Sequence, residues 1–362
     1  MDESLIEDAP IEERSLLPKP GFFVPDSVRE KRKEEKIRDG LSEHSTVMIV
    51  DGDPDGLAAV AVAETVFDDL GYVYTSPNDL DETLERAVDY VEEGATVYVV
   101  DLALDSLEEV DDEYETLEVL TEVADIYWYD HHEWDDETVS ALRGFGVDVV
   151  IGDSDEVCSA DVVLSELENE GYVFGDWVYE LVDVTRDHDL WIKEDPRSDD
   201  LADLGVYLSP DDYLEVIRDG PEIGDEEEDL LKEKREEKEK LIQLAVERAE
   251  FEDIGEVSVA LTYGRCSQNE VSESLRQEGA DAAAVIKPSG GVSLRGSDGF
   301  ERCHEVAKLL GGGGHPRAAG CKPDIFDTMF DYLRHWTQEG DESKSEILGA
   351  FEEVVSDSVT HD

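Results

Sequence analysis

Three short apolar runs in the first 130 residues each lead into an aspartate, and the third continues into two histidines. The runs end at Asp51, Asp101 and Asp130-His131-His132. Such β-branched and aromatic runs predict buried parallel strands. Because ligands of open α/β sheets bind beyond the carboxyl ends of the strands, we expect these side chains at one sheet edge. Carboxylates and imidazoles brought together in this way predict a metal site.

The loop after the first run carries an acid at every second position. Asp51, Asp53 and Asp55 alternate with glycine and proline before a helical pattern begins. A calcium-binding EF-hand loop is longer, ends in a distal glutamate and follows a helix, whereas this loop follows a strand. A plain acidic turn stays open as an alternative for this loop taken alone.

The remaining candidate ligands indicate a metal site only when they are considered together. Asp101 taken alone would more often cap a helix than bind a metal. The pair His131-His132 is more informative, because the chain has only eight histidines. A further acid is expected from Asp187 or Asp189, at the end of a predicted helix. The spacing does not decide between these two, and Asp187 is slightly favoured.

This ligand set predicts both the ion and the reaction. Mixed Asp and His ligands suit Mn²⁺, with Mg²⁺ or Co²⁺ as alternatives. Six or seven ligands exceed the needs of one octahedral ion and fit two ions about 3.5–4 Å apart that share a carboxylate. Such a pair produces hydroxide near neutral pH and holds both oxygens of an in-line phosphoryl displacement. We therefore expect hydrolysis of a phosphate ester or anhydride.

A run of four glycines, Gly311–Gly314, is followed by His315. Glycine backbones can turn several N–H groups toward one anion. The alternative is a flexible turn, since helices commonly end at glycine. Arg295, in a predicted strand, could hold a phosphate through two hydrogen bonds or could be an ordinary surface arginine. We expect the substrate to bind at Arg295, Gly312, Gly313, Gly314 and His315.

From residue 46 onward, strand and helix patterns alternate. Strands are expected at 46–51, 72–75, 96–101, 125–130 and 147–151, and helices at 56–70, 81–93, 115–123, 137–143, 158–170 and 176–188. This alternation predicts an α/β fold with a parallel sheet covered on both faces. Around residues 210–229 the pattern loosens.

A second, smaller α/β unit is expected after a helical linker. The residues at 226–251 read as one long helix rich in Glu and Lys, which is typical of a connector. Strands follow at 257–262, 282–286 and 291–295, and helices at 269–277, 301–310, 325–338 and 343–356. The expected domains are an N-terminal arm with one short helix (1–45), a catalytic domain (46–222), the linker (223–252) and a substrate-binding domain (253–362).

The composition is strongly acidic, with 30 basic and 96 acidic residues and a net charge of −66. Self-repulsion of this size would destabilise a compact chain in ordinary salt. At molar salt, where the Debye length is about 3 Å, it would be largely screened. The charge therefore indicates a salt-rich cytoplasm, as in halophilic archaea, with an acidic mesophilic protein as the alternative. Because the charge reflects adaptation, it does not exclude a polyanionic substrate.

Cysteine usage and hydropathy both favour a cytoplasmic location. The four cysteines are widely spaced and form no CxxC pair, so buried reduced thiols are expected rather than a zinc ribbon or redox pair. The sequence shows neither a signal peptide nor an apolar run long enough to span a membrane.

Together these motifs resemble the DHH phosphoesterases. The acidic first loop, a strand-end Asp, Asp-His-His and a downstream Asp look like the four motifs of that family. The second half looks like the associated DHHA1 domain, and the resemblance covers about residues 45–340. The DHHA1-like segments are Asn269-Glu270-Val271, Ser293-Leu294-Arg295 and the Gly-Gly-Gly-Gly-His-x-x-Ala-Ala-Gly run that starts at Gly311.

The resemblance implies a two-Mn²⁺ phosphoesterase with a cleft between the domains. By matching positions, Asp53 and Asp101 would hold one ion, and Asp101 would bridge to the other. That second ion would also be held by Asp55, His131 and Asp187, with Asp189 as the alternative to Asp187. The Gly311–His315 loop and Arg295 would bind a phosphate or terminal nucleotide.

The resemblance also implies roles for three neighbouring residues, which we count as catalytic. His132 would orient or protonate the leaving group, and Asp130 would be a ligand or support one. Asp51 resembles the acid of RecJ-type nucleases.

The expected function is exonuclease or phosphodiesterase action on single-stranded nucleic acid or short oligonucleotides. The chain ends soon after the DHHA1-like part and leaves no evident room for an OB domain, so its size is closer to nano-RNase-like members than to long RecJ exonucleases. One alternative is a cyclic-dinucleotide or phosphonucleotide phosphatase, and another is a catalytically silent replication or repair scaffold. RNA or DNA preference, cleavage polarity and length preference stay open, as does a homodimer or a replication or repair partner.

Overall fold

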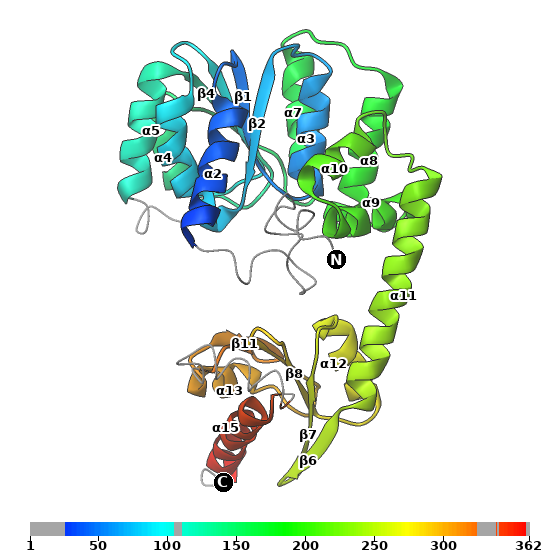
Figure 1. Ribbon diagram of the computed structural model, residues 1–362. Coiled ribbons are helices and arrows are strands. Elements are labelled where there is room, and N and C mark those ends of the chain that lie inside the picture. Colours follow the sequence, from blue (N-terminus) through cyan, green and yellow to red (C-terminus); the bar gives the residue numbers. More distant parts are fainter. Residues whose placement is uncertain (1–25, 105–110, 324–337, 339, 360–362) are drawn as a thin grey trace, which may run out of the picture. The chain divides into compact units, whose positions relative to one another are not determined.

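A computed structural model describes residues 26–104, 111–323, 338 and 340–359 (Figure 1). The chain divides into two compact units, Met1–Glu228 and Asp229–Asp362. The boundary falls in the first turn of a long helix, α11 (Asp225–Glu247). Among the described residues, no helix has both the length and the apolar character needed to span a membrane.

The first unit is built on a five-stranded sheet in which every neighbouring pair is parallel. Its strands follow the order β2-β1-β3-β4-β5. Central strands such as β3 are buried on both faces, which explains their nearly continuous apolar sequences. The strands are β1 (Thr46–Asp51), β2 (Leu70–Thr75), β3 (Thr96–Val100), β4 (Asp125–Asp130) and β5 (Asp148–Ile151).

Helices cover both faces of this sheet. One face packs on the apolar sides of α2, α4, α5 and α6, and the other carries α3 and α7 (Figure 1). The helices are α2 (Asp26–Leu41), α3 (Pro54–Glu64), α4 (Leu80–Tyr90), α5 (Asp111–Val123), α6 (Asp136–Gly144) and α7 (Ser159–Asn169), with a short 3₁₀ helix at Pro77–Asp79.

Helix α2 lies in the segment that the sequence placed in an N-terminal arm, yet it forms part of the first core. Its Ile37 and Leu41 are buried with the strands and with α4. Gly40 and Gly71 make close approach possible, because a Cβ on Gly71 would lie 2.2 Å from the Gly40 carbonyl oxygen. Helix α2 therefore packs directly against β2, an edge strand of the sheet.

Two helices were missed where the sequence pattern loosens. After α8 (Asp176–Asp189), the chain forms α9 (Pro196–Tyr207) and α10 (Pro210–Ile217). Both begin with proline at the first helical position, after capping by Asp195 and by Ser209. Proline at this position is a recognised helix-start signal, because its missing N–H would have no intrahelical partner anyway.

The second unit contains a six-stranded sheet in the order β10-β11-β9-β8-β7-β6. Its neighbouring strands are antiparallel except for the parallel pair β7–β8. Helices α13 and α15 pack on one face and α12 on the other. The elements are β6 (Glu250–Ile254), β7 (Val257–Tyr263), α12 (Gln268–Gln277), β8 (Ala282–Ile286), β9 (Val292–Gly296), α13 (Cys303–Leu309), β10 (Gly313–His315), β11 (Ala318–Cys321) and α15 (Asp341–Val359).

The predicted α/β class, with a parallel sheet followed by a second α/β unit, is confirmed. The predicted long helix ends at Glu247 rather than 251, because the chain then enters β6. The helix expected at 325–338 falls mainly outside the described residues. The glycine run was expected to be a loop, but Gly313, Gly314 and His315 form a short edge strand.

Candidate metal centre

The strand order creates a natural ligand site. Strand β1 lies between β2 and β3, so the chain crosses to opposite sides of β1 in its first two connections. Ligands of open α/β sheets bind at such a switch point, beyond the carboxyl ends of the strands. Asp51 ends β1, and Asp101 follows the end of β3. The acid-ended runs therefore converge where a sheet of this topology has its crevice.

The acidic loop places its carboxylates in different environments. Asp53 is exposed and accepts hydrogen bonds from the backbone N–H groups of Asp55 and Gly56, which caps α3. Asp55 is 2% exposed and accepts hydrogen bonds from the backbone N–H groups of Ser159 (2.6 Å) and Ala160 (2.9 Å). The buried Asp55 carboxylate thus lies at the N-terminus of α7, where the helix dipole favours negative charge.

Three carboxylates surround one nitrogen of His131. Nε2 of His131 lies 3.4 Å from Asp189, 3.8 Å from Asp101 and 3.9 Å from Asp55. These atoms come from the ends of β3, β4 and α8 and from the start of α3. Two overlapping sets of donor atoms are close enough for a cation: Asp55, His131 and Asp189, and Asp101, His131 and His132.

Burial and mutual repulsion oppose the ionisation of these acids. Burial, together with the charges of Asp189 and Asp53, raises the pKa of Asp55 to about 7. Burial and the charges of Asp55 and Asp53 raise the pKa of Asp101 well above its usual value. Burial also raises the pKa of Asp189, although His131 opposes this. Like charges gathered in a buried site can ionise together when a cation balances them.

Unsatisfied atoms support the same conclusion. Oδ2 of Asp189 and Nδ1 of His131 are buried without a hydrogen-bond partner. Buried polar atoms in proteins are nearly always paired, so such exceptions need an explanation. A divalent cation fits the donor set, since carboxylate and imidazole ligands suit Mn²⁺ and Mg²⁺. The residues present therefore fit the predicted metal.

Both carboxylate oxygens of Asp130 accept hydrogen bonds from neighbouring residues. One oxygen accepts hydrogen bonds from the backbone N–H groups of His131 and His132 and lies 2.8 Å from Nδ1 of His132. The other accepts the indole N–H of Trp134 at 2.7 Å. Burial favours the neutral acid, but the bonds from His132 and Trp134 outweigh it and lower the pKa of Asp130. Asp130 thereby orients the His132 ring and holds the backbone at both histidines.

His132 is half-exposed and presents its ring beside that of His131, with ring centroids 4.6 Å apart. The hydrogen bond to Asp130 raises the pKa of His132, which favours its protonated form. Asp51 is also half-buried, and burial and the charge of Asp53 raise its pKa to about 6. Both residues lie where sequence reasoning placed catalytic groups, at the carboxyl ends of β4 and β1.

The slightly favoured Asp187 does not face the cluster. Its carboxylate accepts hydrogen bonds from Ser198 Oγ and from the backbone N–H groups of Glu194 and Asp195. Burial would raise the pKa of Asp187, but these bonds outweigh it and lower the value. Asp189, one helical half-turn later, points to His131 instead. Spacing alone could not separate them, because the choice depends on the turn that follows α8.

Sequence reasoning missed Ser159, which joins the carboxylates. Its hydroxyl donates to Asp101 at 2.9 Å and approaches Asp130 at 3.4 Å, while its backbone N–H donates to Asp55. The side chain is fully buried. Its position at the start of a predicted helix was visible in the sequence, but nothing there showed that this helix points at the acids.

In the second unit, Arg295 and His315 lie in one row across the sheet. Ala318 pairs with Arg295 on one side and with His315 on the other. Directly opposed residues share a sheet face, and two strand spacings separate the Arg295 and His315 backbones by about 10 Å. Between them the sheet carries only the small Ala318, and the next row contains Gly313 and Gly320. The two side chains therefore flank a flat surface of small residues.

Arg295 keeps its positive charge available. It hydrogen-bonds the Asn269 side chain and the carbonyl oxygens of Leu294 and Ala319, and takes part in no ion pair within the described part of the chain. A hollow of about 530 Å³ opens beside it, lined by Asn269, Glu270, Glu273, Ser274, Arg276 and Arg295.

Two of the glycine N–H groups that could contribute to the expected anion cradle are used within the chain. The N–H groups of Gly311 and Gly312 donate to carbonyl oxygens of Lys308 and Ala307, which ends α13. They are therefore not directed at an anion. Gly312 and Gly314 are needed for close approach instead, since a Cβ on either would lie within 2.6 Å of a carbonyl oxygen of β11.

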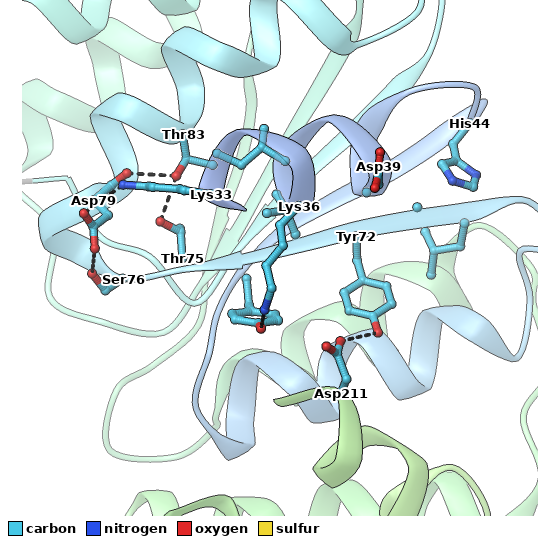
Figure 2. Close-up of a pocket in the computed structure, with 16 residues that line it drawn as sticks. Lys33, Lys36, Asp39, His44, Tyr72, Thr75, Ser76, Asp79, Thr83 and Asp211 are labelled. Carbon is cyan, nitrogen blue, oxygen red and sulfur yellow. Dashed lines mark hydrogen bonds and ion pairs between the residues drawn. The ribbon is translucent and has the colours of Figure 1, made fainter. Parts of the chain in front are cut away.

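A hollow of about 630 Å³ lies elsewhere in the first unit, along β2 between α2 and α10 (Figure 2). Figure 2 shows Lys33 and Lys36 reaching from α2 and Tyr72 pointing to Asp211. None of the clustered acids or histidines lines it. We therefore do not assign the reaction to this hollow, despite its size. The Tyr74 side chain at its wall lies beside Gly52 of the acidic loop.

Comparison with known proteins relates the fold to solved structures. No family model matches the chain, and no curated protein matches it. The exonuclease RecJ bound to manganese superposes with a TM-score of 0.52 at 14% identity, covering 91% of this chain and 95% of that one. At this identity the similarity shows the fold, which this chain shares with RecJ.

Other matching structures are more distant. A DHH domain described as a member of the s1p family of ribosomal proteins matches with a TM-score of 0.45 and 15% identity, covering 98% of this chain and 97% of that one. The pGpG-specific phosphodiesterase PggH from Vibrio cholerae matches with a TM-score of 0.43 and 14% identity, covering 84% of this chain and 98% of that one.

The cluster makes a prediction about metal affinity. Asp101→Asn should weaken Mn²⁺ binding by more than the about 10- to 100-fold that loss of a supporting residue costs, because a ligand is neutralised. Asparagine is the suitable replacement, since Asp101 has a φ of 63°, which asparagine tolerates and alanine does not. Titration calorimetry and elemental analysis at molar KCl give affinity and stoichiometry. Asp125→Asn, an exposed residue at the opposite end of β4, is the control. Equal Mn²⁺ binding by both variants would remove Asp101 from the site.

Proposed function

We propose that the chain is a divalent-metal-dependent phosphoesterase of the DHH/DHHA1 type. Its substrate is single-stranded nucleic acid or a short oligonucleotide, in which it hydrolyses phosphodiester bonds. The observation that carries the proposal is the convergence of Asp55, Asp101 and Asp189 on His131 at the switch point of the sheet. The RecJ-like fold, which RecJ uses as a manganese-bound exonuclease, supports it.

The donor set can hold two ions. Asp55, His131, Asp189 and Asp101 would hold one ion, and Asp101 together with Asp53 would hold the other. Asp53 lies near enough for its charge to raise the pKa of Asp101, so both acids can serve the same ion. When bound, two Mn²⁺ ions lower the pKa of water and supply positive charge to the phosphoryl oxygens.

The chain's own residues complete the chemistry around the ions. Asp130 orients His132, whose raised pKa suits it to give a proton to the departing oxygen. Asp51 can accept a proton near neutral pH, because burial raises its pKa to about 6. Ser159 fixes the bridging acid Asp101 by a hydrogen bond from its hydroxyl. These groups give the site a candidate acid, His132, and a candidate base, Asp51.

The second unit would bind the substrate's phosphate. Arg295 and His315 flank a surface of glycine and alanine on which a sugar-phosphate backbone can lie closely. Arg295 is suited to a phosphate because a guanidinium can donate two parallel hydrogen bonds to it. Gly313 would act by giving the ligand access, and Gly312 and Gly314 by allowing the chain to pack against β11.

The extreme charge sets the conditions for any assay. A net charge of −66 repels a polyanionic substrate in dilute salt, and molar KCl screens that repulsion. We propose that the protein works in a salt-rich cytoplasm, as in halophilic archaea. Local cations, namely the bound ions and Arg295, then attract the substrate at short range.

A hydrolysis panel at molar KCl with Mn²⁺ tests the function. It compares short and long RNA and DNA labelled at the 5′ or 3′ end with cyclic di-AMP, an adenosine bisphosphate and pyrophosphate. We expect turnover of the linear strands to exceed that of the others, because the second unit offers an open surface for a phosphate backbone. Preference for a cyclic dinucleotide or a bisphosphate would favour the alternative phosphatase. Absence of turnover throughout would support the non-catalytic scaffold.

Arg295→Gln and His315→Ala should raise the KM for oligonucleotides while leaving the Mn²⁺ stoichiometry intact. Loss of a charge-assisted hydrogen bond predicts an increase of about tenfold or more for Arg295→Gln. Arg317→Ala is the matched control. Arg317 lies in the β10–β11 hairpin that carries His315, but its charge is neutralised by Asp298 and Glu301. Steady-state kinetics and elemental analysis provide the readouts. Loss of metal in His315→Ala, or an equal effect of Arg317→Ala, would contradict the assignment.

A further inference from the structure

We propose that Trp191 is a stacking platform for a nucleobase, presented beside the metal centre by the turn that follows Asp189. The inference rests on the proposed function and extends it, because it assigns recognition of a base, not only of phosphate, to the first unit. Four observations carry it: the exposure of the ring, its backbone conformation, its position, and the cation beside it.

The indole ring is left in water. Trp191 is 76% exposed, whereas the exposed aromatic residues Phe251, Tyr172 and Tyr179 range from 37% to 43%. Single exposed apolar residues are common on proteins, so exposure alone says little. An exposed aromatic ring is nevertheless what proteins that bind single-stranded nucleic acid use to stack bases.

The backbone at Trp191 is held in an unfavourable conformation. Its φ is 55°, and that of Lys193 is 60°, in the left-handed region that bulky residues avoid. Buried Asp187 enforces the turn: its carbonyl oxygen accepts the N–H groups of Ile192 and Lys193. Its carboxylate accepts the next two N–H groups and the Ser198 hydroxyl. Strain maintained in this way commonly accompanies a functional position.

The turn keeps the backbone of Trp191 close to the reacting groups. Trp191 follows Asp189 by two residues, and Asp189 lies 3.4 Å from Nε2 of His131. Two peptide units keep the Cα atoms of Asp189 and Trp191 within about 7.6 Å. This is the scale of one or two nucleotides, which rise about 3.4 Å each along a stacked strand. A nucleotide with its phosphate at the metal centre can therefore bring a base to the ring.

A cation lies over the same ring. Nζ of Lys193 is 4.8 Å from the centroid of the Trp191 ring, and the His188 ring centroid is 5.9 Å away. Lys193 also pairs with Asp199, which holds it in place. The combination of an aromatic ring and a cation suits a base and its phosphate together.

The test measures binding, so it does not depend on turnover. Calorimetry at molar KCl with Mn²⁺ compares adenosine monophosphate with ribose 5-phosphate, which lacks the base. Stacking predicts that the native protein binds the nucleotide about tenfold or more tightly. Trp191→Asn should abolish this preference, since asparagine suits the left-handed backbone but has no ring. Trp191→Phe should keep most of it. Val206→Ala, also at a site 76% exposed, is the control and should keep all of it.

A spectroscopic measurement gives a second, independent readout. Adenosine monophosphate should quench part of the fluorescence of the native protein, and Trp191→Phe should lose that quenching while still binding. The proposal is overturned if the native protein shows no preference for the nucleotide, or if Trp191→Asn retains it. A native protein with the preference but without any hydrolysis would contradict the proposed function and leave the platform standing. A native protein that hydrolyses oligonucleotides but does not prefer adenosine monophosphate to ribose 5-phosphate would support the proposed function and contradict the stacking platform.

Discussion

The accumulation of negative charge around His131 is the constraint on which the rest of the first unit depends. The sheet delivers Asp101 and His131 from neighbouring strands, α3 delivers Asp55, and α8 delivers Asp189. Bringing buried carboxylates this close costs free energy unless a cation balances them. The N-terminus of α7 offsets part of this cost through hydrogen bonds to Asp55. The fold thus brings together buried carboxylates whose mutual repulsion a divalent cation would relieve.

Two further carboxylates, Asp130 and Asp187, position the residues of the cluster through hydrogen bonds. Asp130 uses both oxygens for hydrogen bonds within β4 and the loop that follows. Asp187 does the same for the turn after α8. In both cases hydrogen bonds stabilise the ionised carboxylate, which lowers its pKa despite burial. Acids that look alike in sequence therefore divide into those that face His131 and those that hold the backbone.

The sequence predicts which acids gather at the sheet edge, but not which of them face His131. The strands of the first sheet, the switch-point acids and the long α11 helix followed from periodicity, because buried parallel strands and charged helices have distinct patterns. Strands β6 and β11 of the second sheet were not predicted. The choice of Asp189 over Asp187 did not, since it depends on hydrogen bonds made by a turn several residues later. Strand β10 was also missed, because a run of glycines usually indicates a loop. Here the glycines allow the chain to pack closely against β11. Ser159 was missed because its role arises only when α7 meets the sheet.

The most direct test of the central claim is the pH dependence of the stabilisation by Mn²⁺. The pKa of Asp55 in the metal-free fold is about 7, above the value of about 3.9 for a free aspartate. Because the native state holds this proton more tightly than the unfolded chain, the stability it provides is complete below about pH 4 and is lost as the pH rises through about 7. Mn²⁺ takes over the balancing charge across that range. The difference in Tm between Mn²⁺-loaded and EDTA-treated protein at molar KCl should therefore widen from about pH 5 to about pH 8. A constant or narrowing difference would contradict this account of the site.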